Sequence, residues 1–73
     1  MTFEKLAERI AGHIGIAVED ITQDTKFEDL GIDSLDTVEI LMDIEEELGI
    51  QLVLDEKLET VGQFHQFIES KLA

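Results

Sequence analysis

The chain of 73 residues has no cysteine, proline, tryptophan or tyrosine. Without cysteine it can form neither a disulfide nor a thiolate zinc site, so any thiol chemistry must come from an added group. No apolar run approaches membrane-spanning length, and there is no cleavable signal pattern. We therefore expect a single domain over residues 1–73 that is cytoplasmic, monomeric and not stably inserted in a membrane.

Basic residues are also scarce. Five lysines and arginines stand against 18 acidic residues, which gives a formal charge of −13. This charge excludes nucleic-acid binding, which needs the opposite sign. The apolar fraction of 44% excludes a disordered acidic tail. Two interpretations of the acidity remain, namely solubility and electrostatic steering toward basic partner surfaces.

The first half of the chain predicts one helix and a long connection. Residues 3–14 follow the i, i+3, i+4 rhythm of an amphipathic helix, with Thr2 as the N-cap and Gly15 near the end. Residues 16–33 are too polar for a continuous helix. Because a long loop is unusual in a compact domain, we expect it to be held on the core by its apolar residues. These are Ile16, Val18, Ile21, Phe27, Leu30 and Ile32.

A second helix is predicted over residues 34–48, with Gly49 as its C-terminal stop. Steps of 100° separate an apolar sector from an acidic one. The apolar sector contains Leu35, Val38, Leu41, Met42, Ile44 and Leu48, and the acidic one Asp36, Glu39, Asp43, Glu46 and Glu47. Glu45 projects into the apolar sector, for which the pattern offers no reason.

The remaining residues predict a linker and two further helices. Residues 50–54 lack a strand partner, so we expect an apolar linker lying on the bundle. Asp55–Leu58 suggests one helical turn, and Thr60 with Gln63 forms a capping-box pattern before a helix over 61–72. Its inward residues are predicted to be Val61, Phe64, Ile68 and Leu72. The fold class is therefore all-α, a small four-helix bundle with three longer helices and one short helix.

The segment Gly31-Ile32-Asp33-Ser34-Leu35-Asp36 contains the candidate functional residue. It places Ser34 at the start of the second helix, where backbone N–H groups and the helix dipole favour a phosphate on the serine oxygen. The plain alternative is that Ser34 is only the N-cap. No base is identifiable beside it, so it is not a catalytic nucleophile. We predict no metal site, and His13 and His65 are interpreted as surface or boundary residues.

These features together closely resemble acyl carrier proteins over essentially the whole chain. The resemblance implies that a phosphopantetheinyl transferase moves a 4′-phosphopantetheine arm from coenzyme A to Ser34, with a magnesium ion and with the help of Asp33. It also implies that the protein catalyses no reaction itself. Its partners would be acyl-transferring, condensing and reducing enzymes with basic docking patches. The recognition residues that match are Asp33, Leu35, Asp36, Glu39, Glu45 and Glu46.

The cargo would be an acyl chain sheltered between the apolar faces of the helices. The candidates for such a pocket are Leu41, Ile44, Ile50, Leu52, Phe64 and Ile68, although the same residues would form the core in any case. The motif looks most like fatty-acid carriers, while a polyketide, aminoacyl or D-alanyl carrier remains open. Alternatives of other classes are an acidic interaction protein without a prosthetic group and a calcium-responsive helical protein.

Overall fold

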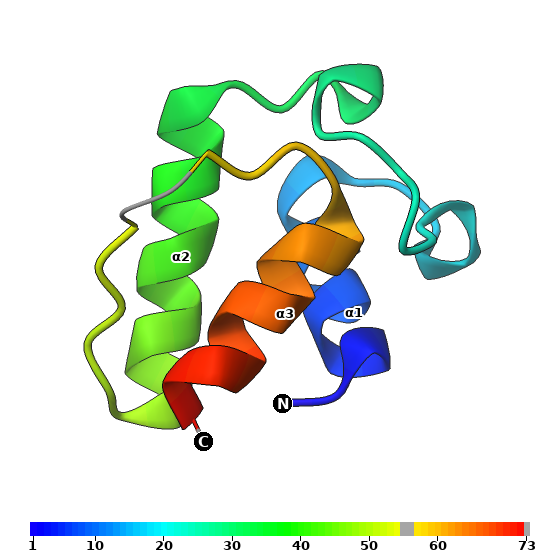
Figure 1. Cartoon of the computed structure of the whole chain (residues 1–73). Helices are drawn as coiled ribbons and strands as arrows, with labels where there is room; N and C mark the ends of the chain where they lie inside the picture. The colour runs from blue at the N-terminus through cyan, green and yellow to red at the C-terminus, as the bar shows by residue number, and fades with distance from the viewer. Residues whose placement is uncertain (55–56, 73) are drawn as a thin grey trace.

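Three α-helices make up most of the computed structural model, which describes residues 1–54 and 57–72 (Figure 1). They are α1 (Phe3–Ile14), α2 (Ser34–Leu48) and α3 (Val61–Leu72), with two 3-10 turns, η1 (Val18–Asp20) and η2 (Glu28–Leu30), between α1 and α2. The described residues contain no β-strand, only an isolated bridge between Lys26 and Thr60. The all-α prediction is confirmed. None of the helices in this part of the chain is long and apolar enough to cross a membrane.

The helix ends follow the signals read from the sequence. The N–H of Lys5 donates to the Thr2 hydroxyl at 3.2 Å and so caps α1. Gly49 ends α2 with a φ of 67°, which a residue with a side chain rarely adopts. Thr60 accepts a hydrogen bond from the Gln63 N–H at 3.1 Å, as the predicted capping box requires.

The predicted fourth helix is not confirmed. Asp55 and Glu56 lie outside the described residues, while Lys57 and Leu58 are described and are not helical. Residues 50–54 form an irregular linker, as predicted, with Leu52 buried. The bundle in the described part of the chain is therefore one of three helices, and the short helix stays a prediction.

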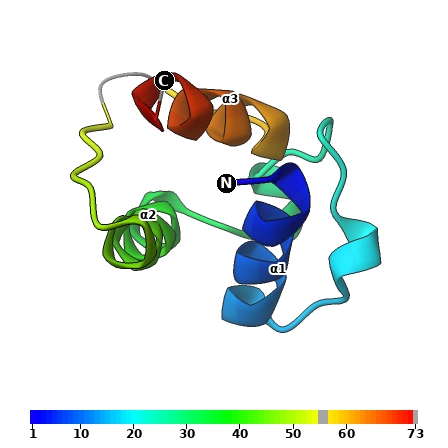
Figure 2. The same ribbon diagram turned by 90° about the horizontal axis from the view of Figure 1, so that it is seen from below.

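The core lies where the three helices meet, with α1 in contact with both α2 and α3 (Figure 2). Its helical members are Leu6, Ala7, Ile10, Ala11, Ile40, Leu41, Ile44, Val61, Phe64, Phe67 and Ile68. Leu72, predicted to face inward, is 39% exposed because it lies in the last turn of α3, and Phe67 is buried instead.

The apolar sector predicted for α2 is also partly wrong. Leu35, Val38 and Met42 are exposed by 73%, 45% and 58%, whereas Ile40 is buried. The two other helices, α1 and α3, both lie on one side of α2 (Figure 2), and the buried residues of α2 form only a narrow stripe of Ile40, Leu41 and Ile44. We refer to Leu35, Val38 and Met42 as the outer stripe of α2.

The long connection between α1 and α2 is held on the bundle as predicted. Its buried residues are Ile21, Phe27 and Ile32. The backbone N–H of Phe27 donates to the Glu59 carbonyl at 3.0 Å, and the N–H of Val61 donates to the Thr25 carbonyl at 2.9 Å. These bonds fix η2, and with it the start of α2, beside the start of α3.

Candidate functional site

The start of α2 is capped by Asp33 and not by Ser34. The Asp33 carboxylate accepts the Asp36 N–H at 2.9 Å, and the Asp36 carboxylate faces the Asp33 N–H at 3.5 Å, which together form a capping box. The Thr37 hydroxyl adds a third contact by donating to the Asp33 carbonyl at 3.0 Å. The plain interpretation of Ser34 as the N-cap is therefore wrong.

Ser34 is the first residue of α2 and is exposed. Among the described residues its hydroxyl has no hydrogen-bond partner. Buried Ile32 anchors the chain just before the turn into the helix, and Ile40 anchors the inner face two turns later. This arrangement presents the serine oxygen to solvent at a fixed place on a rigid element, where an enzyme can reach it.

An open depression of about 460 Å³ lies beside this serine. It lies between the turn that leads into α2 and the segment that leads into α3. The residues that line it are Lys26, Phe27, Glu28, Gly31, Ile32, Asp33, Lys57, Leu58 and Glu59. Two of the five basic residues of the chain are therefore found next to the candidate attachment site.

The predicted recognition residues do not share one environment. Glu39 and Glu46 are exposed and Asp36 is half-buried, and all three lie on α2 together with the outer stripe. Asp33 and Leu35 are also exposed. The surface of α2 thus combines carboxylates with an apolar stripe, and the sequence reading had placed that stripe in the core.

Glu45 has a structural partner that accounts for its place in the apolar sector. Its carboxylate accepts the backbone N–H of Leu52 at 2.7 Å in a partly buried setting. Its backbone carbonyl accepts the N–H of Gly49 at 2.9 Å. One residue therefore ties both the end of α2 and the linker that follows, which periodicity alone does not reveal.

The candidate acyl-pocket residues lie in the core. Ile44, Phe64 and Ile68 are fully buried, Leu52 and Leu41 are nearly so, and Ile50 is half-buried. Neither of the two depressions described here is lined by any of the six. The structure brings the six together as packing residues.

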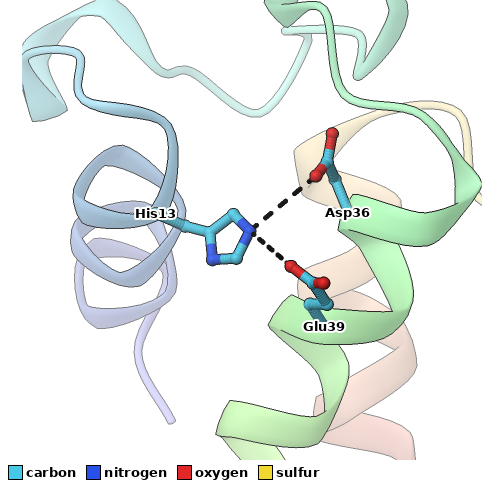
Figure 3. Close-up of side chains that lie close together, drawn as sticks. All are labelled: His13, Asp36 and Glu39. Carbon is cyan, nitrogen blue, oxygen red and sulfur yellow. Dashed lines mark ion pairs between the residues drawn. The ribbon is translucent and has the colours of Figure 1, made fainter.

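His13, interpreted from the sequence as an unremarkable surface or boundary residue, lies close to the first turns of α2 (Figure 3). Its Nε2 atom is 3.4 Å from a Glu39 carboxylate oxygen and 4.0 Å from an Asp36 carboxylate oxygen. More than twenty positions separate these residues in the sequence, so no short motif could have indicated the contact.

A second link between α1 and α2 is the ion pair of Arg9 and Glu47. The Arg9 guanidinium approaches the Glu47 carboxylate at 2.6 Å and 3.0 Å. The hydrogen bond from Arg9 lowers the pKa of Glu47, and the same bond raises the pKa of Arg9. Because the pair is exposed to solvent, it contributes only modestly to the stability of the contact between the two helices.

The fold and the site define a small helical domain that presents an exposed serine at the start of an acidic helix. Residues 4–68 match the family described as "Phosphopantetheine attachment site", and the chain belongs to that family. It is also similar to proteins named acyl carrier protein from several serotypes of Streptococcus pyogenes. Two of these are 39% identical over 69 residues, which cover 94% of this chain and 93% of each relative.

Proposed function

We propose that the protein carries acyl groups as thioesters on a 4′-phosphopantetheine arm attached to Ser34. The observation that carries the proposal is the capping of α2 by Asp33, which leaves the Ser34 hydroxyl exposed and without a hydrogen-bond partner among the described residues. Membership of the phosphopantetheine attachment family and the resemblance to acyl carrier proteins support it. The similarity to relatives named acyl carrier protein favours intermediates of fatty acid biosynthesis as the cargo.

Attachment joins the Ser34 oxygen to the phosphate of the arm, with 3′,5′-adenosine bisphosphate leaving from coenzyme A. The phosphopantetheinyl transferase supplies the catalytic groups and the magnesium ion, since no side chain of the described residues is hydrogen-bonded to the Ser34 hydroxyl as a base would be. The arm supplies the thiol that the cysteine-free chain lacks. Lys26 and Lys57 line the adjacent depression together with the carboxylates of Glu28, Asp33 and Glu59, so the depression offers the phosphate of the arm no net positive charge.

Partner enzymes are proposed to dock on α2. Glu39 and Glu46 are exposed on this helix, and a charge of −13 attracts basic surfaces over distances longer than a direct contact. The outer stripe of Leu35, Val38 and Met42 adds apolar area at the same helix. Long-range attraction raises the association rate without requiring a tight complex, which suits a protein that must visit several enzymes in turn. The protein itself catalyses none of their reactions.

An acyl chain is proposed to enter between α2 and α3 by parting residues that are packed in the structure described here. Ile44 and Phe64 are both fully buried, and Leu52 on the linker packs into the same core. Residues 50–54 are well placed to move, because they have no regular secondary structure. This step requires a displacement of the core and is separate from attachment of the arm.

The test is modification by a broad-specificity phosphopantetheinyl transferase with coenzyme A and magnesium, followed by intact mass measurement and peptide mapping. The unmodified chain is compared with Ser34→Ala and with the matched control Ser70→Ala. Ser70 is the other serine of the chain, and its hydroxyl donates to the Phe67 carbonyl within α3. We expect one phosphopantetheinyl unit on the wild type and on Ser70→Ala, and none on Ser34→Ala.

Circular dichroism on all three proteins verifies that the variants are folded. Replacing an exposed first-turn serine that makes no capping bond is expected to change the unfolding temperature little. A folded wild type that gains no mass beside a modified control carrier would refute the proposal. The acidic interaction protein would then be the leading interpretation.

A further inference from the structure

We propose that His13, Asp36 and Glu39 form a binding site for one divalent transition-metal ion of the zinc type, bridging α1 and α2. One possible ligand atom from each residue lies within 4.8 Å of those from the other two. The imidazole comes from the C-terminal half of α1, and both carboxylates come from the first turns of α2 (Figure 3). The site is independent of the attachment of an arm to Ser34.

The spacing of the ligand atoms fits a small metal ion. Zinc bonds to histidine nitrogen and carboxylate oxygen are about 2.0–2.2 Å long, so two ligands of a tetrahedral ion lie about 3.4 Å apart. His13 Nε2 is already 3.4 Å from a Glu39 oxygen. The Asp36 oxygen is 4.0 Å from the same nitrogen, and all three ligand atoms lie within 4.8 Å of one another, so side-chain shifts of about one ångström bring them to tetrahedral spacing.

The orientation of Asp36 is held by the backbone. One of its carboxylate oxygens faces the N–H of Asp33 in the capping box, and the other is the one directed toward His13. Both ion pairs that the described structure gives to Asp36 and Glu39 are with this one imidazole. Arg9, the nearest basic residue on α1 before His13, is already paired with Glu47.

The mixed ligand set indicates the class of ion. Magnesium and calcium prefer oxygen ligands, whereas an imidazole together with carboxylates suits zinc and its neighbours in the transition series. Two carboxylates also balance the charge of a divalent ion. An adjoining open depression of about 430 Å³, lined by His13, Arg9, Gly12 and Asp43 among others, gives solvent access to complete the coordination shell.

The experiment is a calorimetric titration of the folded protein with zinc chloride in the presence of excess magnesium, which occupies weak carboxylate sites. Wild type is compared with His13→Gln, Glu39→Gln and the control His65→Gln. His65 is the other histidine of the chain, and its Nε2 atom contacts the Met1 carbonyl and a single carboxylate, that of Glu69. We expect one saturable equivalent, weakened ~10-fold or more in the first two variants and unchanged in the control.

Nuclear magnetic resonance supplies a second readout. Zinc should shift the imidazole signals of His13 and leave those of His65 in place, and one equivalent should raise the unfolding temperature because the ion joins two helices. Absence of a saturable equivalent, or equal affinity of wild type and His13→Gln, would overturn the proposal. His13 would then be no more than an ion-pair partner of the two carboxylates.

Discussion

The hydrogen bond from the Leu52 N–H to the Glu45 carboxylate predicts a large effect of an apparently ordinary surface substitution. The bond is 2.7 Å long, is partly buried and joins α2 to the linker seven residues later. Glu45→Ala removes the acceptor but keeps the backbone bond that ends the helix. The backbone N–H of Leu52 then loses its hydrogen-bond acceptor, and Leu52 itself is only 4% exposed.

A buried donor left without a partner costs about 1–3 kcal/mol, and bonds to charged acceptors lie at the stronger end of hydrogen-bond contributions. We therefore expect Glu45→Ala to lower the free energy of unfolding by about 2 kcal/mol. For a domain of this size that corresponds to a fall in Tm on the order of 10 °C. Glu45→Gln keeps an acceptor oxygen but loses the charge, so its effect should be about half as large.

Thermal unfolding followed by circular dichroism measures these shifts. The matched control is Glu46→Ala, because Glu46 is adjacent, exposed and carries the same charge. Removing either charge relieves repulsion in a chain of formal charge −13, so the control isolates the hydrogen bond from that relief. If Glu45→Ala and Glu46→Ala unfolded at the same temperature, the structural role given to Glu45 would be refuted.

Three further predictions concern stability and are measured in the same assay. Gly62→Ala should destabilise the protein by about 1–3 kcal/mol, because the new Cβ would lie 2.7 Å from the Gln23 backbone oxygen. At Gly12 a Cβ meets no atom within 4 Å, so Gly12→Ala should stabilise α1 by about 1 kcal/mol. Equal effects of the two substitutions would contradict this reasoning. The Glu47 pKa is lowered, so its pair with Arg9 stabilises above the ordinary pKa of 4.5, and this stability is lost as the pH falls through the lowered value; Arg9→Gln should reduce this acid sensitivity. Added magnesium or salt should raise Tm by screening the negative charge, and a fall would count against that reasoning.

The sequence predicted most of the fold because its signals are local. Thr2, Gly49 and Thr60 act within four residues of the helix end they define, and each does what its residue type predicts. The apolar residues of the long connection were also correctly expected to hold it on the core. The N-cap of α2 was harder to predict, because aspartate and serine are both good N-caps. Only the structure shows that Asp33, and not Ser34, accepts the capping hydrogen bond.

The parts that could not be predicted depend on contacts between distant residues. The approach of His13 to Glu39 requires knowing how α1 and α2 cross, and the bond of Glu45 to the linker requires knowing where residue 52 returns to the helix. A helical projection also assumes that every apolar residue in a sector has a neighbour. On α2 the bundle covers only a narrow stripe, so the same pattern left Leu35 and Met42 exposed.

This division of α2 into two apolar surfaces leads to a last prediction. Val38 and Ile44 are both β-branched residues of one helix, but Val38 is 45% exposed and Ile44 is fully buried. Ile44→Ala should therefore cost about 2–5 kcal/mol through lost burial and a cavity, while Val38→Ala should change the free energy of unfolding by less than about 0.5 kcal/mol. Denaturant unfolding measures both.

Val38→Ala and Ile44→Ala also distinguish a role in core packing from a role in docking, when binding to a basic partner enzyme is measured alongside unfolding. If the outer stripe served only the fold, truncating one of its side chains would lower the free energy of unfolding. Binding of the folded protein to the partner enzyme would not change. A docking stripe shows the reverse, since the loss falls on contacts that exist only in the complex. Weakened partner binding by a fully stable Val38→Ala protein is the result expected from its exposure, and unchanged binding together with a lower unfolding free energy would place Val38 with the core instead.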